Sequence, residues 1–173
     1  IMDGLPVCIR LFDPPLHEFL PRERQEMLEL AEALGLPVSK IIERTKELSE
    51  FNPMLGMRGV RLGITLPEIY EMQARAIFEA TVLAQKSDIL ITPEIMIPLV
   101  SAQKEVELIW SYVEKVANDV RQETNHFFEY KFGVMVETPR AALRAGDIAK
   151  SSSFMSFGTN DLTQMTYGLS RDD

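Results

Sequence analysis

The sequence predicts an α/β protein with a parallel sheet, because short apolar runs alternate with longer helical segments. Four apolar runs, at residues 5–12, 95–100, 132–136 and 154–157, have the length and composition of strands. Segments with helical periodicity separate them, and this alternation is typical of parallel strands joined by right-handed crossovers. A closed barrel of eight such units takes about 250 residues. The 173 residues therefore predict either a smaller open sheet or half of a barrel.

Two of the predicted strands end in side chains that suit a metal ion. The run 132–136 is followed by Glu137, and the run 154–157 leads into Asn160 and Asp161, where a helix is expected to begin. Carboxyl ends of parallel strands meet at one edge of the sheet, where such folds bind ligands. Glu137 and Asp161 are therefore predicted to bind one divalent cation together. An alternative role for Asp161 is to stabilise the first turn of its own helix.

Two arginines are candidate anion ligands. Arg10 interrupts the first apolar run, which we interpret as a buried strand, and a buried guanidinium needs a partner. It is therefore either a member of a structural ion pair or an anion ligand. Arg58 lies in the glycine-rich segment 52–63, predicted to be a tight loop that presents its side chain, or else a solvated turn with surface arginines. Arginines and carboxylates together suit a magnesium-bound, phosphorylated or carboxylated small molecule.

The remaining segments supply helices. They are predicted at 22–34, from a cap at Ser39 to about Leu48, from a cap at Thr65 to about Lys86, after a cap at Ser101, and at 139–149. The first two helices, at about 22–50, have the character of an insertion that covers the sheet. No role is assigned to His17 or His126, because neither has a second histidine or a cysteine at metal-ligand spacing.

Composition excludes several classes of protein. A formal net charge of -8 argues against nucleic-acid binding, which depends on lysine and arginine neutralising phosphates. No apolar stretch reaches the 18 residues of a membrane span, so a soluble chain is expected. The single cysteine, Cys8, fits a reducing compartment, which makes the cytoplasm the default and leaves an organelle open. The ending 171–173 carries no terminating signal, so we expect a fragment of a longer protein.

Four motifs carry a resemblance to a known family. They are Gly4–Pro21 (GLPVCIRLFDPPLHEFLP), Asn52–Leu62 (NPMLGMRGVRL), Val136–Pro139 (VETP) and Ser156–Gln164 (SFGTNDLTQ). In this order, through the whole chain, they resemble the phosphoenolpyruvate-utilising domain of the pyruvate phosphate dikinase family. Phosphoenolpyruvate synthase and Enzyme I of the sugar phosphotransferase system are similar in VETP and GTNDLTQ. The segment 4–21 is what indicates the dikinases.

The resemblance implies a partial (β/α)8 TIM barrel, with this chain supplying roughly strands three to six and their helices. Residues 1–173 would then be part of one pyruvate/PEP-binding barrel domain with the helical insertion at about 22–50. The implied reaction is the reversible, Mg²⁺-dependent transfer of a phosphoryl group from a phosphohistidine to pyruvate, giving phosphoenolpyruvate. In the complete enzyme, ATP and phosphate would be converted to AMP and pyrophosphate. The phosphohistidine would lie on a separate swivelling domain, and the complete protein would be a homodimer.

The resemblance also assigns roles to residues of this sequence. Glu137 and Asp161 would bind Mg²⁺ and, through it, pyruvate or its enolate. The other implied site residues are Asn160 as a substrate ligand, Arg10 and Arg58 as ligands of the transferred phosphoryl group, and Gly158 and Thr159 as backbone contacts. Fixed cations at these places agree with the negative charge that spreads over the transferred oxygens during phosphoryl transfer.

Three departures limit what this chain is expected to do alone. The family's proton-donating cysteine belongs to a later strand outside this sequence, and Cys8 does not replace it. The phosphohistidine segment and the nucleotide-binding domain are also outside it, and Met57 stands where some relatives have histidine. We therefore expect an inactive fragment of an enzyme. The alternatives are phosphoenolpyruvate synthase, Enzyme I, or a truncated interaction domain that pairs through its half-barrel surface.

Overall fold

The computed structural model describes residues 2–49 and 54–170, and the chain divides into two compact units. One unit consists of residues 14–58; the other combines the segment up to residue 13 with residues 59–173. Positions 52 and 53, which begin the motif at 52–62, and the ending 171–173 lie outside the described residues.

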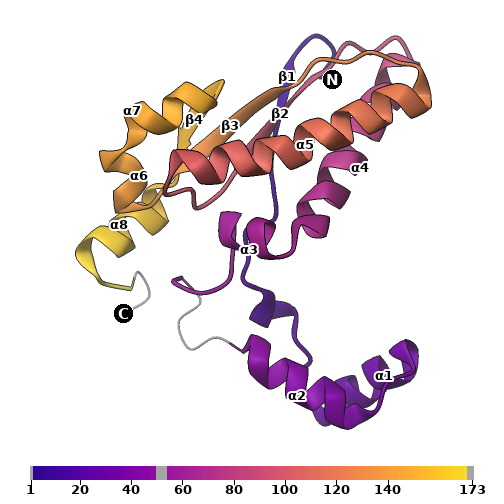
Figure 1. Cartoon of the computed structure of the whole chain (residues 1–173), viewed down its shortest axis with the longest axis vertical. Coiled ribbons are helices and arrows are strands. Elements are labelled where there is room, and N and C mark those ends of the chain that lie inside the picture. Colours follow the sequence, from indigo (N-terminus) through magenta and orange to yellow (C-terminus); the bar gives the residue numbers. More distant parts are fainter. Residues whose placement is uncertain (1, 50–53, 171–173) are drawn as a thin grey trace. The chain divides into compact units, whose positions relative to one another are not determined.

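The larger unit is built on a four-stranded parallel sheet in the order β1-β2-β3-β4 (Figure 1). The strands are β1 (Pro6–Arg10), β2 (Thr92–Ile97), β3 (Lys131–Val136) and β4 (Phe154–Phe157). Every strand pairs with the next one along the chain, and the sheet curls as half of a barrel does. The sequence-based prediction of an α/β fold with a partial (β/α)8 TIM barrel is therefore confirmed.

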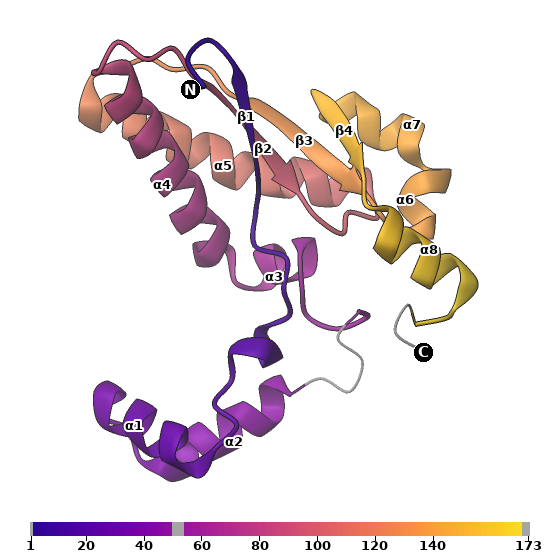
Figure 2. The same ribbon diagram turned by 180° about the vertical axis from the view of Figure 1, so that it is seen from behind.

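Along the chain, the helices of this unit lie between consecutive strands and after the last strand. They are α3 (Val60–Thr65), α4 (Pro67–Gln85), α5 (Gln103–Thr124), α6 (Pro139–Leu143), α7 (Ala145–Ile148), the 3-10 turn η2 (Ala149–Ser151) and α8 (Thr159–Tyr167). The two long helices, α4 and α5, lie side by side, and both views show them against the same face of the sheet (Figure 2). Within residues 2–49 and 54–170, no helix is long and apolar enough to cross a membrane.

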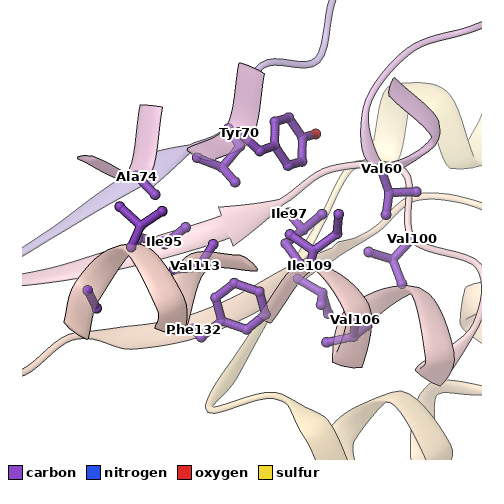
Figure 3. Close-up of a cluster of buried hydrophobic side chains, with 14 of the residues drawn as sticks. Val60, Tyr70, Ala74, Ile95, Ile97, Val100, Val106, Ile109, Val113 and Phe132 are labelled. Atoms are coloured by element: carbon purple, nitrogen blue, oxygen red, sulfur yellow. The ribbon is translucent and has the colours of Figure 1, made fainter. Parts of the chain in front are cut away.

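The core forms where the apolar faces of α4 and α5 meet the sheet (Figure 3). Side chains alternate along β2 and β3, and one set packs in this core. The set comprises Ile95, Ile97, Phe132, Val134 and Val136, against Val106, Ile109 and Val113 of α5. Each fully buried aliphatic side chain stabilises the fold by about 1.5–3 kcal/mol. A shift of one residue would reverse the two faces, so this burial fixes the strand register and hence the places where the strands end.

The smaller unit is helical. It contains the 3-10 turn η1 (Leu16–Phe19), α1 (Arg24–Leu34) and α2 (Val38–Leu48), and the two α-helices pack against each other. The Glu26 carboxylate accepts the N–H groups of Arg22 and Glu23 and so satisfies donors at the start of α1. Gly35 ends α1 with a φ of 63°, a conformation that glycine adopts without strain.

The structure corrects four predictions about strands and loops. The first strand is not buried: its residues alternate between exposed and half-buried, because β1 is at the edge of the described sheet. The second strand begins at Thr92 and ends at Ile97, whereas the apolar run predicted 95–100. Part of the predicted loop at 52–63 is helical, since α3 begins at Val60. The predicted helix at 139–149 is divided into α6, α7 and η2.

Three predicted helix caps are also wrong. The N-cap positions are Pro37, Leu66 and Ala102, in place of Ser39, Thr65 and Ser101. The Thr65 hydroxyl donates to the Arg61 carbonyl, one turn back in α3, at 2.8 Å. At the start of α5 the Glu105 carboxylate accepts the amides of Ser101 and Ala102. A charged acceptor in the first turn thus performs the role that the sequence assigned to a hydroxyl.

Candidate active site at the carboxyl ends of the strands

Glu137 follows β3 directly and is a buried carboxylate, with 1% of its surface exposed. Its Oε1 atom accepts the N–H of Leu99 at 2.7 Å. Leu99 follows β2 and has a φ of 58°, which few residues other than glycine adopt. The distorted turn after β2 therefore aims a backbone donor at the end of β3, and this explains why the apolar run 95–100 is not strand throughout.

The next residue fixes the chain beyond the carboxylate. The Thr138 hydroxyl donates to the Val100 carbonyl at 3.0 Å and accepts the Ala141 N–H at 3.1 Å. It is therefore the N-cap of α6. Both neighbours of the β3 end, the turn after β2 and the start of α6, hold Glu137 in place.

Gly158 brings the end of β4 against the same carboxylate. Its N–H donates to the Val136 carbonyl at 3.1 Å, which extends the pairing of β3 and β4 to the site. A Cβ at position 158 would lie 2.2 Å from Glu137 Oε2 and 2.6 Å from Glu137 Cβ, too close for any side chain. The absence of a side chain at this position thus provides the space in which the carboxylate lies.

The environment of Glu137 favours its neutral form. Burial raises its pKa from the ordinary 4.5 to about 7, and the negative charges of Asp13 and Asp161 act in the same direction. The Leu99 N–H and the charge of Arg10 oppose this increase. Glu137 thus changes charge near neutral pH, and a cation bound beside it would favour the ionised form.

We expect the free energy of unfolding to fall as the pH rises. Because the pKa of Glu137 is about 7 in the folded chain and ordinarily 4.5, the folded state binds more protons between these values. The Glu137 contribution is therefore fully present below about pH 4.5 and is lost as the pH rises through 7. The expected loss between pH 5 and pH 8 is about 2–3 kcal/mol.

Urea unfolding followed by the fluorescence of Trp110, the single tryptophan, measures this difference. Glu137→Gln is the control, because glutamine does not titrate. The variant should lose most of the pH dependence. An equal decline in the variant would mean that another group causes it.

Asp161, Asn160 and Thr159 lie in the first turn of α8. Asp161 is half-buried and close enough to influence Glu137, whereas Thr159 and Asn160 are exposed. The structure therefore brings the two predicted metal ligands to one edge of the sheet. It also places Asp161 where a carboxylate stabilises a helix N-terminus, so both interpretations of this residue agree with its position.

A surface pocket of about 360 Å³ lies beside the exposed end of α8. It is lined by Thr159, Asn160, Thr163, Gln164, Tyr167, Leu169 and Ser170. The pocket thus includes two of the predicted substrate ligands but neither of the predicted metal ligands. Glu137, with its raised pKa, and the nearby Asp161 therefore define the candidate site better than this pocket does.

Arg10 ends β1 and forms an ion pair with Asp13, with 3.1 Å between Nη1 and Oδ2. The Arg10 side chain is 41% exposed and the Asp13 side chain 6%. The structure thus confirms that Arg10 belongs to an ion pair. The charges of Arg10 and Asp13 both affect the pKa of Glu137. Arg10 therefore lies at the same end of the sheet as the two predicted metal ligands.

Arg58 belongs to the other compact unit. It is half-buried at the end of a turn that runs through Leu55 and Gly56. This part of the predicted loop, unlike the part from Val60 onward, has no helix or strand. The role of Arg58 stays a prediction.

Two features of the site have no counterpart in the sequence-based prediction. Asp13 is buried beside Arg10. The signal in the sequence that could have revealed this pair is the position of Asp13, three residues after the arginine that interrupts an apolar run. The Leu99 N–H has no such signal, because any residue carries a backbone amide and only the positive φ aims it at Glu137.

The carboxylates fit a hard cation that keeps other ligands. Within the described residues, no group of three or more His, Cys, Asp and Glu side chains is arranged to hold a metal ion. Mg²⁺ is commonly bound by one or two carboxylates and completes its coordination with water and substrate oxygens. The buried Glu137 and the nearby Asp161 are suited to such a site, since a cation would compensate two negative charges held close together.

Comparison with known proteins agrees with the motifs. The family model for the PEP-binding domain of PEP-utilising enzymes matches residues 1–173. The chain is 55% identical over 174 residues to pyruvate, phosphate dikinase 1 of Arabidopsis thaliana, covering 99% of this chain and 18% of that protein. Pyruvate, phosphate dikinase of Rhizobium meliloti is 54% identical over 174 residues, covering 100% and 19%. That of Clostridium symbiosum is 49% identical over 173 residues, covering 99% and 20%. The chain thus spans about a fifth of the length of these relatives.

Proposed function

Because the chain belongs to the family of PEP-binding domains of PEP-utilising enzymes, we propose that it forms the pyruvate and phosphoenolpyruvate site of a pyruvate phosphate dikinase. The observation that carries this proposal is the buried carboxylate of Glu137 at the carboxyl end of β3. An uncompensated negative charge there costs stability. A cation that binds at this edge of the sheet would compensate the charge and so offset the loss of stability.

Glu137 and Asp161 would hold Mg²⁺. When bound, the ion would supply Lewis-acid stabilisation of the negative charge on a substrate oxygen. The two side chains contribute hard oxygen ligands and the negative charge that favours a divalent cation. The close approach of Gly158 keeps the Glu137 carboxylate in one place, and the Leu99 N–H fixes one of its two oxygens.

The arginines would bind the phosphoryl group. A guanidinium matches phosphoryl oxygens bidentately and stays charged at every relevant pH. Arg10 is fixed by its ion pair and is still 41% exposed, so it has room for a ligand. Arg58 would provide a second cation, as its match to the family motif implies.

The start of α8 would bind the substrate itself. Asn160 and Thr159 are exposed in the first turn, and the Asn160 amide can donate to a carboxylate or carbonyl oxygen. The N–H groups at this helix end favour an anion such as the pyruvate carboxylate. Gly158 would contribute a backbone contact, as its match to the family motif implies.

The proposed reaction is a reversible phosphoryl transfer from a phosphohistidine to the enolate oxygen of pyruvate, giving phosphoenolpyruvate. We propose that the phosphohistidine belongs to a swivelling domain of the complete protein, that ATP and phosphate recharge it, and that the complete protein is a homodimer. Residues 1–173 would be part of one barrel domain that the helices at about 22–50 interrupt. We propose that this chain alone does not catalyse the reaction.

A chimera tests this proposal. This chain replaces the matching 174-residue segment of the Rhizobium meliloti relative, to which it is 54% identical. The chimera should exchange labelled pyruvate into phosphoenolpyruvate in the presence of Mg²⁺, and chelation of the metal should stop the exchange. Asp161→Asn should lower kcat/KM about tenfold or more, because it removes one of the two charges that would hold the metal.

The matched control is Asp119→Asn, which changes an exposed aspartate on α5. It should leave the exchange rate unchanged. A folded chimera without exchange would contradict the proposed function. Full activity of Asp161→Asn would instead show that the metal site was assigned wrongly.

A further inference from the structure

Asp13 is a buried carboxylate at the site to which the family motifs assign no role. It pairs with Arg10 at 3.1 Å, and the two partners differ in burial, with 6% of the Asp13 side chain exposed and 41% of Arg10. A carboxylate this buried is stabilised in its charged form by a close cation. The buried member therefore anchors the pair, and the guanidinium is the part that reaches outward.

The backbone that carries Asp13 is held at every residue after β1. The Leu11 N–H donates to the Met96 carbonyl at 2.9 Å, and the Phe12 N–H donates to Gln73 Oε1 at 2.9 Å. The carbonyl of Phe12 accepts the Tyr70 hydroxyl at 3.0 Å. These bonds come from β2 and from the first turns of α4, so two different elements fix the position of the segment.

The α3 segment completes this support. The Asp13 carbonyl accepts the N–H of Gly59, the residue before α3, at 3.2 Å. Gly63 lets α3 approach the Tyr70 ring, since a Cβ at position 63 would lie 2.4 Å from two ring carbons. Tyr70 is fully buried, and this packing directs its hydroxyl to Phe12. The Asp13 carboxylate is thus fixed by the fold before any ligand binds.

We infer that Asp13 is a positioning residue, whose fixed carboxylate orients the Arg10 guanidinium toward the phosphoryl group. This inference rests on the proposed function, in which Arg10 binds that group. An arginine has a long, flexible side chain, and holding it in one orientation beforehand reduces the entropy lost when the ligand binds. Asp13 contacts the Nη1 atom of a side chain that is 41% exposed, and a guanidinium carries five N–H donors, so the pair leaves donors for bidentate contact with a ligand.

A double-mutant cycle in the chimera tests the inference. The variants are Asp13→Asn, Arg10→Ala and the combination of both, and the measured quantities are kcat and KM for pyruvate–phosphoenolpyruvate exchange. Asp13→Asn should lower kcat/KM about 10–100-fold, as loss of an orienting partner does elsewhere. Because Asp13 acts through Arg10, the combined variant should be no slower than Arg10→Ala alone.

Asp147→Asn is the matched control. It removes another Arg–Asp pair with i,i+3 spacing, that of Arg144 and Asp147 at 2.5 Å, far along the chain in α7. It should leave exchange unchanged, which separates the loss of any such ion pair from the loss of this one. Thermal unfolding of each variant shows whether it is folded under assay conditions.

The outcomes distinguish the inference from the function on which it rests. Multiplication of the two single effects in the combined variant would overturn the inference, because Asp13 would then act independently of Arg10. Wild-type rates in Asp13→Asn would overturn it as well. Full activity of Arg10→Ala would overturn both the inference and the proposed role of Arg10.

Discussion

Replacing Glu137 with glutamine in the chimera is expected to lower pyruvate–phosphoenolpyruvate exchange by about 100-fold or more, while the protein becomes more stable at pH 8. The loss follows because the substitution removes one of the two carboxylates proposed to hold Mg²⁺, whose positive charge would stabilise the negative charge on the substrate oxygen. Loss of such electrostatic stabilisation typically costs about 10²–10³ in rate. The gain follows because burial raises the pKa of Glu137 to about 7, so that the ionised form is unfavourable at pH 8. Glutamine has nearly the same shape and no charge to bury.

Opposite signs for activity and stability make this prediction specific. Exchange kinetics and urea unfolding, both at pH 8, measure the two effects on the same preparation. Glu94→Gln is the control, because Glu94 pairs with Lys131 near the beginning of β2 and is outside the site. It should change neither quantity strongly. A Glu137→Gln variant that was inactive and less stable would show only that glutamine disturbs the fold.

Replacing Gly158 with alanine should damage both the fold and the site. The new Cβ would lie 2.2 Å from Glu137 Oε2, so either the carboxylate or the end of β4 must move. Overpacking of this kind costs about 1–3 kcal/mol. For a chain of this length, a loss of about 2 kcal/mol lowers the unfolding midpoint by roughly 4–8 °C. Exchange in the chimera should fall at least tenfold, because the displaced carboxylate is a proposed metal ligand.

Gly146→Ala provides the comparison. Gly146 lies in α7 with nothing within 4 Å of a Cβ built there, so alanine meets open space. Alanine also favours the helix by up to about 1 kcal/mol. Thermal unfolding should therefore show no loss for this variant. Equal destabilisation by the two substitutions would mean that the contact with Glu137 is not what makes Gly158 necessary.

Apolar run length and order were sufficient to predict the parallel sheet and the edge where Glu137 and Asp161 meet. They were not sufficient to predict how deeply each strand is buried. The run at 5–12 is apolar apart from Arg10, but β1 pairs on one side only within the described sheet, and its residues stay partly exposed. Burial depends on neighbours that come from elsewhere in the chain.

Local competition between hydrogen-bond acceptors explains the misplaced helix starts. Ser101 has the composition of a cap, but the Glu105 carboxylate binds the amides of Ser101 and Ala102. Gly59 and Gly63 explain a different error, because a glycine-rich segment predicts a loop. Both permit close packing of a short helix, Gly59 against Leu99 and Gly63 against Tyr70. The sequence does not distinguish a glycine that bends the chain from one that makes room for a neighbour.

Position 99 has a left-handed backbone and a fully buried side chain, and no single residue type suits both. Its left-handed backbone would be relaxed by glycine, which would relieve roughly 1–2 kcal/mol. Its side chain is fully buried, and removing it would leave a cavity that costs about 2–5 kcal/mol. Packing thus outweighs strain, and the turn stays in the conformation that holds its amide against Glu137. Selection for a well-filled interior at this position would therefore also preserve the site, without any direct selection on the amide itself.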